Sequence, residues 1–178
     1  MCSLHIFMDG GNAMTQTRSR CYHCRRSTAT EVLGPVSGAA EQFTLTVLGL
    51  PVQTCESGHR NFAHSKVALQ RLLRLTEEGE PTLPVSRERG RLFKHAACAD
   101  CGGKLERAAR RKTFHVEMHL TDAAAFGIDL TSPVYRCRAC GKEHLSHKEL
   151  RGLAPAALVD ALRSAGIGSD VAATEAKA

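Results

Sequence analysis

The sequence predicts a small α+β protein made of two tandem zinc-ribbon β units, each followed by helix and joined by a charged linker. Three observations support this prediction: three Cys-x-x-Cys pairs, an alternating apolar segment in each half, and a helical pattern after each half. Two residues between paired cysteines let a tight turn aim both sulfurs at one ion, as tetrahedral zinc requires. The predicted segments are a disordered tail over 1–17, the first ribbon and helix over 18–76, the linker over 77–94, the second ribbon and helices over 95–167, and a disordered tail over 168–178.

The cysteines divide into two sets of four ligands, which predicts two bound Zn²⁺ ions. The first set is Cys21, Cys24, Cys55 and His59, and the second set is Cys98, Cys101, Cys137 and Cys140. A site with four protein ligands leaves no position for water or substrate, so both sites are predicted to be structural. Cys2 falls outside both sets, and His64 is the alternative to His59 as the fourth ligand of the first set.

A disulfide framework is the competing explanation for eight cysteines. It would require an oxidising compartment and usually a secretory signal. Residues 1–13 contain only a short apolar patch, and no stretch approaches the roughly 18 apolar residues that span a membrane. We therefore expect a reduced, cytoplasmic protein that makes no membrane contact.

Alternating apolar residues predict a half-buried strand in each unit. Phe43, Leu45 and Val47 alternate with threonines in the first, and the same period of two runs from Phe114 to Leu120 in the second. A returning strand with the pattern Pro-Val-x-x-Cys then delivers the third ligand of each set. The two halves therefore read as copies of one unit.

Helical patterns follow each ribbon. In the first unit the apolar stripe consists of Phe62, Leu69, Leu72, Leu73 and Thr76. In the second unit, residues 146–149 have the form of a capping box, and a separate short helix is predicted from Pro155 to Gly166. Because each unit has few apolar residues, we expect neither to fold without its metal.

The formal charge of +6 is concentrated in one segment. Residues 87–115 contain nine basic and three acidic side chains, whereas the rest of the chain has 15 of each. The nine basic residues are Arg87, Arg89, Arg91, Lys94, Lys104, Arg107, Arg110, Arg111 and Lys112. They are a candidate contact surface for nucleic acid or protein, and a merely solvated surface is equally compatible with them. The absence of Trp and the presence of only two Tyr argue against a protein that stacks bases.

Residues 18–76 resemble the YgiT-type zinc finger, the amino-terminal ribbon of MqsA-like antitoxins. The resemblance is carried by Cys21-x-x-Cys24, by the strand that ends in Gly49-Leu50-Pro51-Val52, and by the metal knuckle that starts at Cys55. It implies a zinc ribbon that contacts a macromolecule, because in that family the ribbon binds a toxin protein. Two positions depart from the family pattern: His59 replaces the last cysteine of the second knuckle, and Arg25 replaces the glycine after the first pair.

These observations predict a non-catalytic adaptor or bacterial-type regulator that binds protein or nucleic acid and has no small-molecule substrate. The sequence has no Gly-rich phosphate loop, no His-Glu-x-x-His motif and no nucleophile motif. One alternative is a thiol-based redox sensor, in which oxidation of Cys55 ejects zinc from the first site. A less favoured alternative is a metal-dependent hydrolase or deaminase, which would need an open coordination position; His115-Val116-Glu117 only partly matches the deaminase pattern.

Overall fold

The computed structural model describes residues 20–62, 64, 67–68, 70–71, 74, 83–90, 95–121 and 123–167. Both predicted disordered tails lie outside these residues. The strands with defined bounds are β1 (Thr28–Val32), β2 (Val36–Ala40), β3 (Phe43–Leu48), β4 (Pro51–Cys55), β5 (Arg60–Asn61), β6 (Arg87–Arg89), β7 (His95–Ala97), β8 (Leu105–Met118), β9 (Phe126–Cys137) and β10 (Glu143–His144), and the helix with defined bounds is α2 (His147–Ser164).

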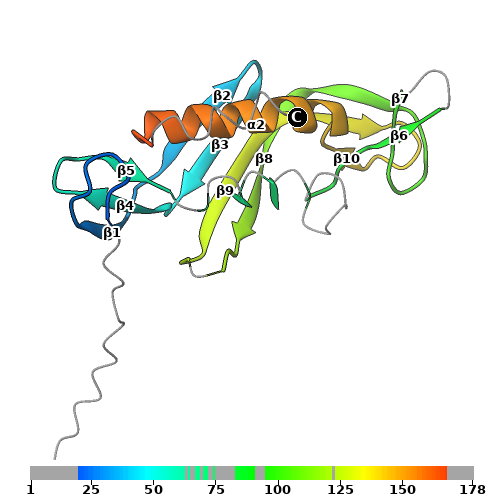
Figure 1. Ribbon diagram of the computed structural model, residues 1–178. Coiled ribbons are helices and arrows are strands. Elements are labelled where there is room, and N and C mark those ends of the chain that lie inside the picture. The colour runs from blue at the N-terminus through cyan, green and yellow to red at the C-terminus, as the bar shows by residue number, and fades with distance from the viewer. Residues whose placement is uncertain are drawn as a thin grey trace, which may run out of the picture.

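A central antiparallel sheet contains strands from both halves of the chain (Figure 1). Its longest-range pairing joins β3 to β9, with Leu45 opposite Leu130. On its other edge β9 pairs with β8 along its whole length. Beyond the end of β3, the carboxyl-terminal part of β9 pairs with the short strand β10. Strand β9 therefore holds the two halves together.

The predicted alternation of the strands is confirmed, and it forms one core. Phe43, Leu45 and Val47 of β3 are buried, as are Phe114 and Val116 of β8. All five belong to a single hydrophobic cluster that also contains residues of β9 and α2. Removing this shared apolar surface from water is the main force that stabilises the sheet.

Helix α2 packs across β2 and β3 and covers this part of the sheet (Figure 1). Gly38 of β2 permits the close contact: a Cβ atom there would lie 2.1 Å from the Ala157 carbonyl oxygen and 2.2 Å from the Ala161 nitrogen. The buried side of the helix consists of small and branched residues: Leu150, Ala154, Ala157, Leu158, Val159, Ala161 and Leu162.

The fold class predicted from the sequence is wrong in its arrangement. The structure has three antiparallel sheets and, with defined bounds in the described residues, one helix near the carboxyl end, whereas two ribbons each followed by helix were expected. The physical reason is that β3 and β9 bury their apolar faces in a common sheet, so the halves share a core and do not form separate units.

In the first unit, Val67, Ala68, Gln70, Arg71 and Arg74 are helical. The stripe residues Leu69, Leu72, Leu73 and Thr76 lie outside the described residues.

The predicted separate helix from Pro155 to Gly166 is also wrong. Helix α2 runs without a break through Pro155, whose missing N–H costs one backbone hydrogen bond. Burial of apolar residues along the helix outweighs that loss, because these residues belong to the shared core.

One half of the predicted capping box is confirmed: Ser146 Oγ accepts a hydrogen bond from the Glu149 amide at 3.3 Å. The Glu149 carboxylate instead accepts a hydrogen bond from the Tyr135 hydroxyl at 2.7 Å.

Part of the predicted linker packs against the domain. Leu83 and Val85 are buried in the shared core, and β6 pairs with β7. The Ser86 amide donates to the Leu145 carbonyl at 2.8 Å, just before α2 begins. Among the described residues, no helix has the length and apolar character needed to cross a bilayer.

Candidate metal centres

The first candidate metal centre lies in the small sheet formed by β1, β4 and β5. Cys21 and Cys24 lie in the turn that precedes β1, Cys55 ends β4, and His59 comes directly before β5. Strands β1 and β4 are antiparallel with Thr28 opposite Cys55, so the pairing brings the two turns to the same end of the sheet. Each predicted ligand of this set is therefore delivered by a strand end or an adjacent turn.

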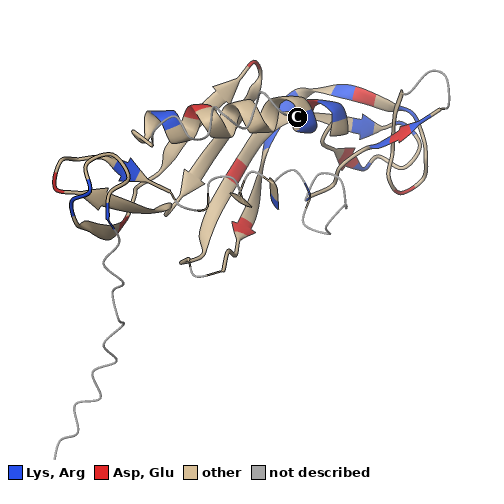
Figure 2. Cartoon of the chain, viewed as in Figure 1, with Lys and Arg blue, Asp and Glu red and all other residues tan. Residues whose placement is uncertain are grey.

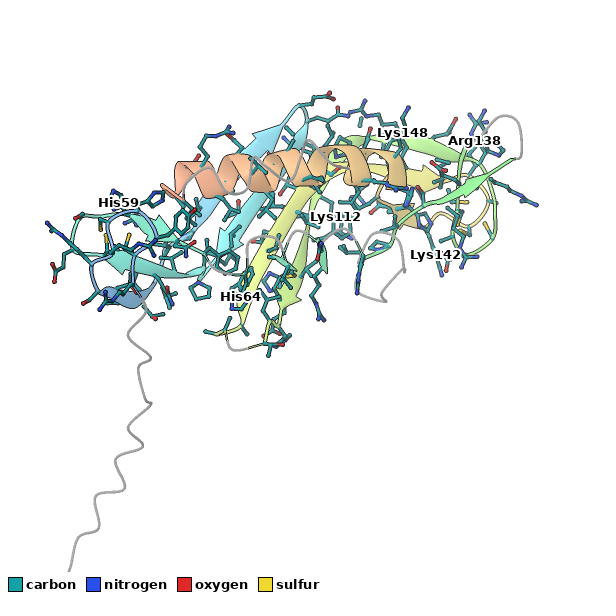
Figure 3. The ribbon with its side chains drawn as sticks, in the orientation of Figure 1. His59, His64, Lys112, Arg138, Lys142 and Lys148 are labelled. Carbon is teal, nitrogen blue, oxygen red and sulfur yellow. The ribbon has the colours of Figure 1, made fainter. Side chains whose placement is uncertain are left out.

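The four predicted donor atoms of the first set come together. All four lie within 4.8 Å of one another. Cys24 Sγ lies 3.6 Å from Cys55 Sγ, and His59 Nδ1 lies 3.5 Å from Cys55 Sγ and 3.7 Å from Cys21 Sγ. The alternative ligand His64 is not in the cluster: its ring packs against Phe62, and Figure 3 shows it away from the sulfur atoms that surround His59.

The hydrogen bonding of the knuckle at Cys55 explains why its second ligand is a histidine at position 59. In the other three knuckles the first cysteine amide bonds to the carbonyl five residues later, for example Cys137 to Lys142 at 2.8 Å. In this knuckle the Cys55 amide bonds to the His59 carbonyl only four residues later, at 3.1 Å. The ligand is thus the residue that closes the turn, and the longer imidazole side chain reaches back to the sulfurs.

The second metal centre lies at the opposite end of the molecule (Figure 3). Its four sulfurs also lie within 4.8 Å of one another, with Cys98 and Cys140 3.6 Å apart and Cys101 and Cys137 3.5 Å apart. Cys98 directly follows β7 and Cys137 ends β9, the strand that crosses the central sheet. The second centre is therefore anchored directly to the shared core.

Charged and polar side chains surround the second centre. Lys142 Nζ lies 2.6 Å from Asp100 Oδ1, and Arg138 pairs with Glu106. His144 is 1 % exposed and its Nε2 lies 3.1 Å from Cys98 Sγ. His144 belongs to β10 and follows Cys140 by four residues, a spacing that already marked it in the sequence as a neighbour of the second ligand set. In the tautomer that carries its proton on Nε2, His144 donates to Cys98 Sγ and stabilises negative charge on that sulfur.

The thiols of each centre have divergent pKa values before metal binds. The Arg26 amide hydrogen bond lowers the pKa of Cys24 to about 6, and the Cys140 amide hydrogen bond lowers that of Cys137 to about 7. The Gly103 amide acts in the same direction on Cys101, but the neighbouring sulfurs, chiefly that of Cys137, raise its pKa to about 12. Thiols crowded this closely share protons until a cation replaces them.

The geometry fits metal ligands and does not fit disulfides. Zinc–sulfur bonds of about 2.3 Å place tetrahedral sulfurs about 3.8 Å apart, close to the separations in both centres. A disulfide would bring two sulfurs to about 2.05 Å. All seven cysteines among the described residues are free. Two cysteine-rich groups that could hold metal ions are thus present at the predicted positions.

Seven of the nine basic residues predicted as a contact surface are described, and all seven are exposed. They lie along β6 and β8 and the turn before β8, interspersed with acidic residues (Figure 2). Arg110 pairs with Glu143, whereas Arg107 and Arg111 donate to the neutral side chains of Gln42 and Thr44. Arg91 and Lys94 lie outside the described residues.

Comparison of the chain with protein-family models, curated proteins and solved structures finds no match. The resemblance to the YgiT-type zinc finger therefore stays a prediction that rests on the first two knuckles and on the strand that ends in Gly49-Leu50-Pro51-Val52.

Proposed function

We propose that the chain is a non-catalytic zinc-binding adaptor or regulatory protein whose macromolecular partner is a nucleic acid. The observation that carries the proposal is that each centre has four protein donors at the spacing of a zinc tetrahedron. Zinc with four protein ligands has a structural role, because it holds distant segments of the chain together. Cys₄ and Cys₃His sets are typical of structural zinc, because thiolates are soft ligands that magnesium and calcium do not prefer.

A catalytic role has less support. The deaminase-like segment that starts at His115 is not part of either cluster, because His115 is paired with Asp129 at 2.7 Å on β9. Asp129 lies eight residues before Cys137, which corresponds to about 26 Å along a strand. The histidine and the metal knuckle therefore do not converge on one site.

The charge of the molecule favours nucleic acid as the partner. Among the described residues, Arg107 and Arg111 of β8 have hydrogen bonds to neutral groups and no carboxylate partner, and both side chains are exposed. This strand is an edge of the central sheet, since it pairs with β9 on one side only. Basic residues on an edge strand also prevent edge-to-edge association, so the proposal needs a test that separates the two roles.

Binding to an oligonucleotide duplex should weaken steeply with salt, with a slope of log affinity against log salt of about −3 or steeper. Arg111→Gln and Lys112→Gln should each flatten the slope by about 0.9, because each removes about one phosphate contact on a duplex. Arg163→Gln, at the far end of α2, is the matched control and should leave the slope unchanged. Fluorescence anisotropy across a salt series measures all four proteins with the duplex and with a single strand of the same length, and flat profiles for the wild type with both would remove nucleic acid as the partner.

Zinc binding to the second centre should release at least two protons at pH 7. Burial and neighbouring sulfurs outweigh the Lys142 amide hydrogen bond and raise the pKa of Cys140, and Cys101 titrates at about 12, so both hold protons that zinc must displace. The affinity should therefore rise about 100-fold per pH unit near pH 7, and more steeply below it, where Cys137 also takes up a proton. Competition with a chromophoric chelator at pH 6.5 and 7.5 measures this dependence, and an affinity independent of pH would contradict it.

A further inference from the structure

The turn of the first metal centre exposes an aromatic ring beside three arginines. Tyr22 is 67 % exposed, the highest value among the large hydrophobic side chains of the described residues. Its ring meets His23 edge-on, with centroids 5.7 Å apart, and His23 lies 5.1 Å from the ring of the metal ligand His59. The exposed Tyr22 ring is thus linked to the metal ligand His59 through the ring of His23.

Three arginines of this turn have no side-chain partner among the described residues. Arg20, Arg25 and Arg26 are exposed, and none has a side-chain hydrogen bond or ion pair within the described part of the chain. Glu31, on the adjoining strand, is occupied by Arg60 at 3.2 Å and by the Thr54 hydroxyl at 2.5 Å. A zinc ion with three thiolates and a neutral imidazole would carry −1, so the turn keeps a net positive charge.

The backbone at Arg25 shows that an arginine is held there against its conformational preference. Arg25 has a φ of +62°, in the left-handed region that disfavours side chains with a Cβ. The equivalent positions of the two knuckles in the second centre are Gly102 and Gly141, with φ of +72° and +73°. A residue kept in a strained conformation where its counterparts are glycine indicates a role for its side chain.

We infer that this turn, Arg20 to Arg26, binds single-stranded nucleic acid by stacking one unpaired base on Tyr22 while the arginines contact the adjacent phosphates. Exposed aromatic rings flanked by positive charge are the arrangement that binds unpaired bases. Two tyrosines in the whole chain argue against a long stacking platform, but one exposed ring is enough for one base. The inference rests on the proposed function, since it names the class of nucleic acid and the residue that reads it.

The test compares a 12-nucleotide single strand with an abasic strand of the same length. Wild-type protein should bind the base-containing strand more tightly, and Tyr22→Ala should weaken that binding about 5- to 150-fold while leaving the abasic strand unaffected. Tyr22→Phe should retain the affinity because it keeps the ring. Val32→Ala, which truncates another exposed apolar side chain of the same small sheet, is the control and should change neither affinity.

Arg25→Gly gives an independent readout. It should raise the melting temperature by roughly 2–4 °C by relieving the left-handed conformation, and yet flatten the salt slope for single strands by about 0.7. A tyrosine fluorescence titration in a Tyr135→Phe background should show quenching of Tyr22 by the base-containing strand only, since the chain has no Trp and two Tyr.

The outcomes separate the two proposals. If wild-type protein binds no oligonucleotide, both the inference and the nucleic-acid function fail. If it binds but Tyr22→Ala and Arg25→Gly behave as wild type, only the inference is overturned, and the exposed turn would be a surface for a protein partner. Loss of base-dependent binding in Tyr22→Ala with retention in Tyr22→Phe would support it.

Discussion

Removal of zinc should open both ends of the molecule while the central sheet stays folded. The amides that close the knuckles, those of Cys21, Cys55, Cys98 and Cys137, should exchange with solvent at least about 1,000-fold faster, because the metal no longer joins the two knuckles of each centre. The β3–β9 pairing around Leu45 and Leu130 should keep its protection, since both residues are fully buried in the shared core. Hydrogen exchange with mass spectrometry after chelation measures both regions.

Re-addition of zinc is the control for this experiment and should restore the knuckle amides. If β3 and β9 lose protection together with the knuckles, the metal is needed for the whole core, as the two-ribbon arrangement predicted from the sequence implied. That outcome would contradict the prediction that the shared core stays folded without metal.

Gly38→Ala should destabilise the protein by about 3 kcal/mol or more. The new methyl group would overlap the α2 backbone, since its carbon would lie only 2.1 Å from the Ala157 oxygen, and backbone in a buried helix cannot move aside as a flexible side chain can. The helix would have to lift from β2, which would expose the apolar residues beneath it. Urea denaturation of the zinc-loaded protein measures the loss of stability.

Two other glycines provide matched controls. Gly34→Ala places a methyl group where no atom lies within 4 Å and should change stability little. Gly152→Ala has equally open surroundings on α2 itself and should stabilise the protein by about 1 kcal/mol, because alanine is the better helix former. Equal effects at positions 38 and 34 would show that α2 does not rest on β2 as described.

The candidate centres could be predicted from the sequence because short motifs, each within a few residues, specify the turns and strand ends that hold the ligands. A Cys-x-x-Cys pair specifies a tight turn, and the pattern Pro-Val-x-x-Cys placed a ligand at the end of β4 and of β9. The replacement of the last cysteine by His59 was also readable, since no other cysteine or histidine follows Cys55 at so short a spacing. The burial of alternate residues in β3 and β8 followed from their period of two.

The arrangement of the two halves could not be predicted in this way. Pairing of β3 with β9 joins residues about 85 positions apart, and nothing local in either strand selects the other as its neighbour. The continuous helix was missed because Pro155 ordinarily marks a helix start, whereas here the buried side of α2 outweighs one lost hydrogen bond. Both errors concern tertiary packing, which overrides local preference.

The measurement that tests the account most directly is the metal content of the untagged protein. Two equivalents of zinc per chain are predicted, and Cys24→Ser and Cys137→Ser should each reduce the content to about one, because each removes a ligand from a different centre. A wild-type protein that contains no zinc, or that contains disulfides between these cysteines, would contradict the account.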